Sequence, residues 1–265
     1  MQENRIKAAL REGRVAVGTS VAELATRGLP KMLEYAGLDW AYIDMEHSGL
    51  DMDSVANLIS WFKATPITVL VRPPDTLYHF MAGLMDAGAM GIQAAHVDSA
   101  EEARMVVDAV MYPPLGKRGV GMNSAHTDYT KPKAADYMPA RNAQTTIVAL
   151  IESVKGLDNI DEIAAVEGLD VIEPTHNDLT LALGIPQQYE HPTYKAALRK
   201  VAEACKRHGK ALKFHAGNDA EAAEMYELGC RIMAIRATTN VLQDALRSDA
   251  DHLRKQVARL SGSTT

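Results

Sequence analysis

Short apolar runs alternate with longer helical patterns along this whole sequence, and the alternation restricts the possible folds more than any other feature. Strands that alternate with helices of about ten residues indicate a parallel sheet. The expected strands cover residues 14–20, 40–44, 67–71, 91–95, 146–151, 169–172, 211–215 and 232–235. The expected helices between them include residues 29–36, 54–63, 76–87, 100–110, 159–166, 194–209 and 219–228.

Eight such units in a chain of 265 residues predict closure into one (β/α)₈ TIM barrel, a single α/β domain covering residues 1–265. An open doubly wound sheet also fits the alternation. Glycines placed just after expected helices support the assignment, since glycine commonly ends a helix. They are Gly37, Gly88, Gly168, Gly209 and Gly229. Residues 261–265 (SGSTT) are expected to form a flexible tail.

Composition excludes several classes of partner. The formal net charge of −6 argues against nucleic acid or an anionic membrane as the main partner. The sequence contains no uncharged apolar stretch of about 18 residues, and its first residues have no signal-peptide core. Cys205 and Cys230 lack metal-ligand spacing, so we expect reduced packing residues in a cytoplasmic protein.

Polar residues directly follow most of the expected strands. In a (β/α)₈ barrel the active site lies at the carboxyl ends of the strands, so these side chains should meet at one rim. The segment 112–144, rich in Pro, Gly, Asn and Lys, is long enough to suggest a functional loop. The rim residues, in strand order, are Asp44, Glu46 and His47, then Arg72 and Asp75, then Glu152, then Glu173, His176, Asn177 and Asp178, and finally Arg236.

Each of these residues also has an ordinary structural interpretation. Glu152 could be a helix cap or a surface acid, and Asp178 could cap the helix that follows it. His47 could be a hydrogen-bonded loop residue, and Arg72 could brace the barrel by pairing with Asp75 or Glu46. Because one geometry brings them all together, their combination favours a site with a metal and a base.

Such a set suits enolate formation. Two carboxylates give Mg²⁺ or Mn²⁺ a partial shell of oxygen ligands, with positions left for water and a 2-oxo acid. The metal would polarise the keto oxygen and stabilise the developing enolate. An arginine can bind the substrate carboxylate through its planar fork, and a histidine can act as general acid or base.

Several motifs resemble those of the HpcH/HpaI family of class II pyruvate aldolases, in the same order and at similar spacing. The similarity extends from about residue 18 to about residue 242. The motifs are IDMEH (43–47), VRP (71–73), MDAGAMG (85–91), VDSAEEA (97–103), YPPLGKRGVG (112–121), IES (151–153) and NDL (177–179).

The resemblance implies a site and an assembly. It implies that Glu152 and Asp178 hold a divalent metal (Mg²⁺, Mn²⁺ or Co²⁺) and that Arg72, with Asn177 and Asp178, binds pyruvate or a related 2-oxo acid such as hydroxypyruvate. His47 would be the base, paired with Asp86 from a neighbouring strand end, and the second substrate would be an aldehyde. The family also implies a homo-oligomer, a hexamer built as a trimer of dimers, in which the last helix packs on a neighbour. Further residues that could support the site are Glu46, His176 and Arg236.

The chain departs from the family pattern at the rim. Thr175 and His176 stand where the family has Gly-Pro, and Ala95 stands where it has proline. After the eighth strand, Arg236 and Thr238 replace the family's Gly and Asp. Arg236 could be an outward-turned arginine, it could pair with an acid on an adjacent subunit, or it could enter the open space and contact the acceptor aldehyde. The donor half of the reaction is thus retained, whereas the acceptor is undefined.

Three other functions are compatible with the sequence. A class I aldolase would need a desolvated Schiff-base lysine, for which Lys213 is the candidate. A metal-dependent lyase acting on a 3-hydroxyacyl-CoA would share the fold but would need a basic groove for the cofactor. A 2-oxo-acid-binding barrel without turnover would be consistent with the altered rim.

Overall fold

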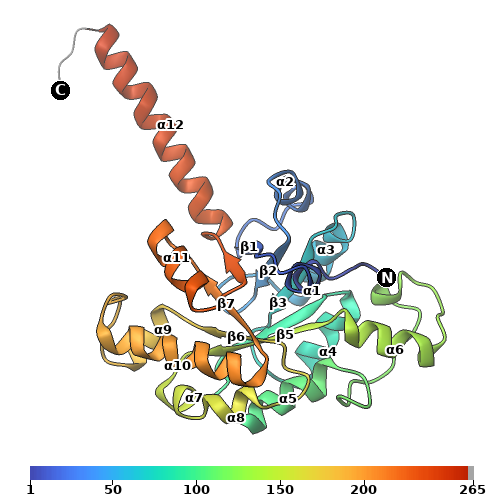
Figure 1. Cartoon of the computed structure of the whole chain (residues 1–265). Coiled ribbons are helices and arrows are strands. Elements are labelled where there is room, and N and C mark those ends of the chain that lie inside the picture. The colour runs from blue at the N-terminus through green and yellow to red at the C-terminus, as the bar shows by residue number, and fades with distance from the viewer. Residues whose placement is uncertain (262–265) are drawn as a thin grey trace.

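Eight parallel strands close into a barrel in which each strand pairs with its neighbours in sequence (Figure 1). This computed structural model describes residues 1–261, and its closed barrel confirms the predicted fold and rules out the open sheet. Residues 262–265 of the expected tail lie outside the described part. The strands are β1 (Ala16–Val21), β2 (Trp40–Asp44), β3 (Thr68–Arg72), β4 (Gly91–Ala94), β5 (Thr146–Ile151), β6 (Val171–Pro174), β7 (Ala211–His215) and β8 (Ile232–Ala234).

Helices surround the barrel, and several of them start at a residue whose side chain caps the first turn. Asp51, Ser99 and Asn218 each accept a hydrogen bond from a main-chain N–H of the first turn, which satisfies a donor that has no partner within the helix. The helices are α1 (Arg5–Arg11), α2 (Leu29–Tyr35), α3 (Met52–Phe62), α4 (Tyr78–Ala87), α5 (Ala100–Val110), η1 (Ala125–Thr127), α6 (Ala134–Ala143), α7 (Val154–Asp158), α8 (Ile160–Ala164), α9 (Asn177–Ala182), α10 (Pro192–His208), α11 (Asp219–Glu227) and α12 (Thr238–Leu260).

Strand β6 begins later than the apolar pattern predicts. Leu169 is buried but precedes the strand, and Asp170 accepts a hydrogen bond from the main-chain N–H of Ile147 at the entrance to the sheet. The strand extends to Pro174, and Glu173 lies within it, not after it as expected. Glu173 is buried there.

The apolar core has two layers. An outer layer fills the space between strands and helices, and a smaller inner cluster fills the barrel. Trp40 lies in the inner cluster with no exposed surface, and its ring passes so close to Gly18 that a Cβ there would lie 2.2 Å from it. Glycine is therefore required at position 18. Cys205 and Cys230 are buried and unpaired, as expected of packing residues.

The long segment 112–144 lies at the end of the barrel away from the carboxyl ends of the strands. It joins the end of α5 to the start of β5, and it contains η1 and α6 instead of being an open loop. Helix α6 is fixed to the barrel by Asn142, whose side chain exchanges hydrogen bonds of 2.9 Å with the main chain of Tyr112. The expectation that this segment is functional stays a prediction.

Helix α12 projects from the barrel and does not pack against it (Figure 1). Of its 23 residues only Thr238 is buried. Within the described residues, no helix is long and apolar enough to cross a membrane.

Candidate active site

A cavity of about 560 Å³ opens at the carboxyl ends of the strands, where the sequence places the functional residues. Its walls combine side chains from most of the strands, and the candidates Glu46 and Asp86 are not among the residues that line it. The lining includes Ser20, Tyr42, His47, Arg72, Gln93, Glu152, Glu173, Thr175, His176, Asn177, Asp178, His215, Arg236 and Asn240.

The carboxylate of Glu152 projects from the end of β5 and is held by His96. The main-chain N–H of His96 donates a hydrogen bond of 2.8 Å to Oε2 of Glu152, and the ring Nδ1 lies 3.3 Å from the same oxygen. Burial raises the pKa of Glu152, an effect that the His96 contacts oppose and the charges of Asp178 and Glu46 reinforce. The uncompensated negative charge around Glu152 would be relieved by a cation.

Asp178 supplies the second carboxylate. It lies in the first turn of α9, but the N-cap residue is His176 and no side chain caps the helix, so the capping interpretation is not supported. Neither Glu152 nor Asp178 forms an ion pair with lysine or arginine within residues 1–261. The described residues contain no group of three or more His, Cys, Asp or Glu placed to hold a metal. A divalent cation held by these two carboxylates would therefore have to take its remaining ligands from water and substrate.

Arg72 contacts two acids, Asp44 along its Nε and Nη2 edge and Glu46 at Nη1. Its Nε lies 2.9 Å from Oδ1 of Asp44, and Nη1 lies 2.8 Å from Oε2 of Glu46. The alternative pairing with Asp75 is not formed, whereas the one with Glu46 is. The hydrogen bond with Asp44 raises the pKa of Arg72 despite burial. Arg72 nevertheless lines the cavity, so it faces both the acids and the open space.

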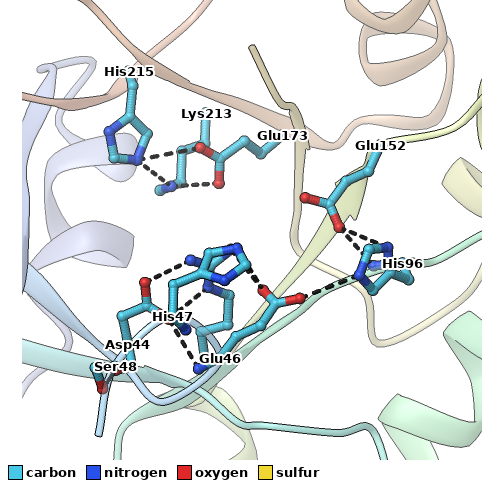
Figure 2. A network of polar contacts seen from close by, with 10 residues as sticks. Asp44, Glu46, His47, Ser48, His96, Glu152, Glu173, Lys213 and His215 are labelled. Atoms are coloured by element: carbon cyan, nitrogen blue, oxygen red, sulfur yellow. Dashed lines mark hydrogen bonds and ion pairs between the residues drawn. The ribbon is translucent and has the colours of Figure 1, made fainter. Parts of the chain in front are cut away.

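His47 follows β2, and 63% of its side chain is exposed. Its main-chain N–H donates to Oδ1 of Asp44, and its ring Nε2 lies 3.8 Å from Oε2 of Glu46. Figure 2 shows Glu46 between His47 and His96, with the Nε2 of His96 3.1 Å away. Glu46 is thus a supporting residue that connects the histidines to Arg72.

Asp86 does not lie at a strand end. It is the penultimate residue of α4, so it lies at the end of the barrel opposite the cavity. Its carboxylate pairs with Arg118 and lies 3.7 Å from Nε2 of His126. The expected placement beside His47 is therefore wrong within one chain, because helices run back along the barrel while strands run toward the cavity.

Thr175 and His176, which stand where the family has Gly-Pro, lie in the cavity wall, and so does the adjacent Asn177. His176 packs against Phe214, with ring centroids 4.3 Å apart, and burial lowers its pKa. Asn177 accepts a hydrogen bond of 2.7 Å from the hydroxyl of Tyr189. The structure thus brings Asn177 and Asp178 together with Glu152 and Arg72, as predicted.

Three polar residues inside the barrel were not recognised from the sequence as one group. Lys213 donates a hydrogen bond to Glu173, and His215 lies against both (Figure 2). Lys213 has no exposed surface and does not line the cavity, so no substrate carbonyl reaches it for a Schiff base. The signal was present in the ALKFH run of β7, where Lys213 and His215 alternate with Leu212 and Phe214 and so face one side of the strand. His96 was also not recognised from the sequence, although it lies only two residues after the end of β4.

Arg236 follows β8 and lines the cavity. Its guanidinium pairs with Asp244 of α12 in the same chain, and its main-chain carbonyl accepts a hydrogen bond of 2.9 Å from Thr19. About half of the side chain is exposed. Arg236 thus pairs with an acid of its own chain, not of an adjacent subunit as considered, and it also borders the open space.

Comparison with known proteins gives consistent matches. The sequence model of the HpcH/HpaI aldolase/citrate lyase family matches residues 23–245. The chain is 31% identical over 262 residues to a hydroxypyruvate/pyruvate aldolase of Pseudomonas aeruginosa, covering 99% of this chain and 97% of that protein. It is 32% identical over 252 residues to a 5-keto-4-deoxy-D-glucarate aldolase of Escherichia coli K12, covering 95% and 97%. The crystal structure of an HpcH/HpaI aldolase from Desulfitobacterium hafniense superposes with a TM-score of 0.89 at 32% identity, covering 94% and 96%.

Proposed function

This chain belongs to the HpcH/HpaI aldolase/citrate lyase family, and on that premise we propose that it reversibly cleaves 4-hydroxy-2-oxo acids into a 2-oxo acid and an aldehyde. The relatives named as aldolases make it a carbon–carbon lyase. Pyruvate or hydroxypyruvate is the proposed 2-oxo acid, because the similar Pseudomonas aeruginosa protein is named for both.

One observation carries the proposal. Glu152 and Asp178 present two carboxylates to the cavity, and neither has a cationic side-chain partner in the described chain other than the imidazole of His96. Oxygen ligands of this kind suit Mg²⁺, Mn²⁺ or Co²⁺. When bound there, such a cation would polarise the keto group of the substrate and stabilise the negative charge that develops on its oxygen.

Arg72 holds the 2-oxo acid. A guanidinium has five N–H donors, and Asp44 accepts from two of them, at Nε and Nη2, while Glu46 lies at ion-pair distance from Nη1 without a hydrogen bond. One N–H on Nη2 and two on Nη1 are therefore left for the carboxylate or keto oxygen of the substrate. The two acids fix the plane of the fork, which lowers the entropy lost when the substrate binds.

His47 moves the proton. In the cleavage direction it accepts the proton of the C4 hydroxyl as the C3–C4 bond breaks. The carbonyl of the aldehyde forms, and the electron pair of the broken bond passes to C3 to give the enolate of the 2-oxo acid. A proton is then returned to C3, which converts the enolate into the 2-oxo acid. The exposed ring of His47 has no strong hydrogen bond of its own, so it is free to meet the substrate.

Proton exchange tests the proposal without knowledge of the natural aldehyde. The metal-loaded protein should exchange the methyl protons of pyruvate in D₂O, as followed by NMR. Chelation with EDTA should stop the exchange without unfolding the barrel, and Mg²⁺, Mn²⁺ or Co²⁺ should restore it. Full exchange in excess EDTA, or trapping of Lys213 by borohydride in the presence of pyruvate, would falsify the metal-dependent mechanism.

We also propose that the protein is a homo-oligomer, a hexamer made of three dimers, in which α12 covers a neighbour. The outward residues Val17 of β1 and Met233 of β8 are only half-buried, whereas β2 to β6 are buried throughout. A helix is therefore missing from that side of the barrel. Along α12, five of the six exposed large apolar residues fall within an arc of about 60°, given the 100° rotation per residue. They are Leu242, Leu246, Leu253, Val257 and Leu260.

A further inference from the structure

The part of the cavity that the 2-oxo acid leaves free lies against β7, β8 and β1. Arg72 is on β3, and in a closed barrel of eight strands in sequential order β3 lies opposite β7. The two carboxylates follow β5 and β6, on the arc between these two strands. The aldehyde must therefore extend toward the other wall, which includes Ser20, His215 and Arg236.

A buried ion pair lies beneath this wall. The ammonium of Lys213 donates to Oε2 of Glu173, and it lies 5.2 Å from the ring centroid of Trp40 and 5.1 Å from that of Tyr42. Neither Lys213 nor Glu173 has more than 3% of its surface exposed. Aromatic faces and a single carboxylate thus hold the lysine nitrogen in one position, and its remaining polar neighbour is His215.

This lysine determines which ring nitrogen of His215 carries the hydrogen. Its Nζ lies 3.4 Å from Nε2 of His215 with hydrogen-bond geometry, whereas Oε1 of Glu173 lies 3.4 Å from the same nitrogen at ion-pair distance only. An ammonium group can only donate, so Nε2 is the acceptor and Nδ1 carries the hydrogen. Burial lowers the pKa of His215 to about 3, which keeps the ring neutral with this single hydrogen.

Several hydrogen-bonding groups of the cavity lack a protein partner. Within residues 1–261, Nδ1 of His215 has none, and 27% of the His215 side chain is exposed. The buried Oγ1 of Thr175 and Oε1 of Gln93 also have none, but Gln93 is on β4 and Thr175 follows β6, on the 2-oxo-acid side of the cavity. On the acceptor side, the unpaired Nδ1 of His215 disfavours an alkyl ligand and favours one that carries an oxygen.

We infer that His215 is a specificity-determining residue that donates a hydrogen bond from Nδ1 to an oxygen of the acceptor, and that the preferred acceptor is an aldehyde with a hydroxyl group next to its carbonyl. The inference rests on the proposed aldolase function. Lys213 and Glu173 are positioning residues that act through His215. A neutral imidazole suits this role because it donates to a neutral hydroxyl or carbonyl oxygen without transferring its proton.

The test compares two acceptors that differ only in hydroxyl groups, glyceraldehyde and propanal, with pyruvate as donor. Wild type should show the higher kcat/KM for glyceraldehyde. His215→Leu should lower this ratio by about tenfold or more, because the hydroxyl loses its donor. His215→Gln, which keeps an N–H donor, should retain part of the preference. His208→Leu, on the outer surface of α10, is the matched control and should leave the ratio unchanged.

A second variant tests the positioning role. Lys213→Met/Glu173→Gln removes both charges together, so that no unpaired charge is left inside the barrel. It should raise KM for glyceraldehyde while KM for pyruvate stays within about twofold, whereas a merely structural defect would change both.

Pyruvate proton exchange separates this inference from the proposed function. Exchange should persist in His215→Leu, because the donor side is intact. Absence of exchange in wild type would refute the aldolase proposal itself. Exchange that persists in both proteins with an unchanged glyceraldehyde-to-propanal ratio would overturn the role of His215 alone. A wild-type preference for propanal would overturn the proposed acceptor class.

Discussion

Nε of Arg72 lies 2.9 Å from Oδ1 of Asp44, and the two residues are direct partners in the pairing of β2 with β3. The same oxygen of Asp44 accepts hydrogen bonds from the main-chain N–H groups of Glu46 and His47. One carboxylate therefore orients both the arginine that holds the 2-oxo acid and the loop that carries the base.

Arg72→Lys should weaken donor binding while it keeps a positive charge beside Asp44. A lysine lacks the planar fork, so at least one charge-assisted hydrogen bond to the substrate is lost, at about 1.5–3 kcal/mol. KM for pyruvate should rise by about tenfold or more, and kcat should fall with it. Steady-state kinetics check this, with Arg207→Lys on the outer surface as control. Unchanged kinetics in Arg72→Lys would contradict the assignment.

His47→Ala should leave pyruvate and metal binding nearly intact, because its ring has no strong contact in the structure. Proton transfer should slow by about 10²–10⁴, the usual contribution of a general base. Calorimetric binding of pyruvate and single-turnover cleavage measure the two effects separately. If the variant keeps more than about a tenth of wild-type cleavage, the base lies elsewhere, and His176 is the next residue to test.

Arg236→Gly should change the choice between charged and neutral acceptors. The side chain borders the cavity, but Asp244 already neutralises part of its charge. We expect the kcat/KM ratio for an anionic aldehyde over a neutral one of similar length to fall by about tenfold, which corresponds to one charge-assisted bond. Asp244→Asn should raise the same ratio. Equal ratios in wild type and both variants would leave Arg236 with a structural role only.

His215 should make the fold less stable in acid. Burial lowers its pKa to about 3 from an ordinary value of 6.5, so below pH 6.5 the unfolded chain takes up a proton that the folded chain does not. The contribution to stability is complete above pH 6.5 and is lost as the pH falls toward 3. Urea unfolding at pH 7.5 and pH 4.5 should show that His215→Leu loses less free energy of unfolding than wild type. Equal losses would contradict the depressed pKa.

Leu246→Asp/Leu253→Asp should break the oligomer. Both leucines are exposed on the apolar stripe of α12, and two buried carboxylates without partners would oppose association. Light scattering after gel filtration should give a smaller assembly than wild type. Ser248→Asp, on the opposite side of the helix, should leave the mass unchanged. An equal mass in all three proteins would refute the role of α12.

Much of the architecture follows from local patterns. Each apolar run is short and is followed by a helix, several of these helices have a side-chain cap or a closing glycine, and the eight repeats leave little choice besides a barrel. The same patterns place Arg72, Glu152 and Asp178 at strand ends, and all three line the cavity. His47 follows for the same reason, since a residue just beyond a parallel strand must lie at the rim.

Other features depend on contacts between segments far apart in the chain. Glu173 is buried inside the barrel because it lies within β6, which pairs with β5 and β7, and not after the strand. The polar group of Glu173, Lys213 and His215 forms because closure of the sheet aligns β6 with β7, and only that alignment decides that Lys213 is shielded instead of reactive. Asp86 lies at the opposite end because helices return along the barrel. Local sequence determines which way a side chain faces on its own strand or helix. Closure of the barrel determines which partner the side chain meets, and that partner sets the protonation and the accessibility of the group.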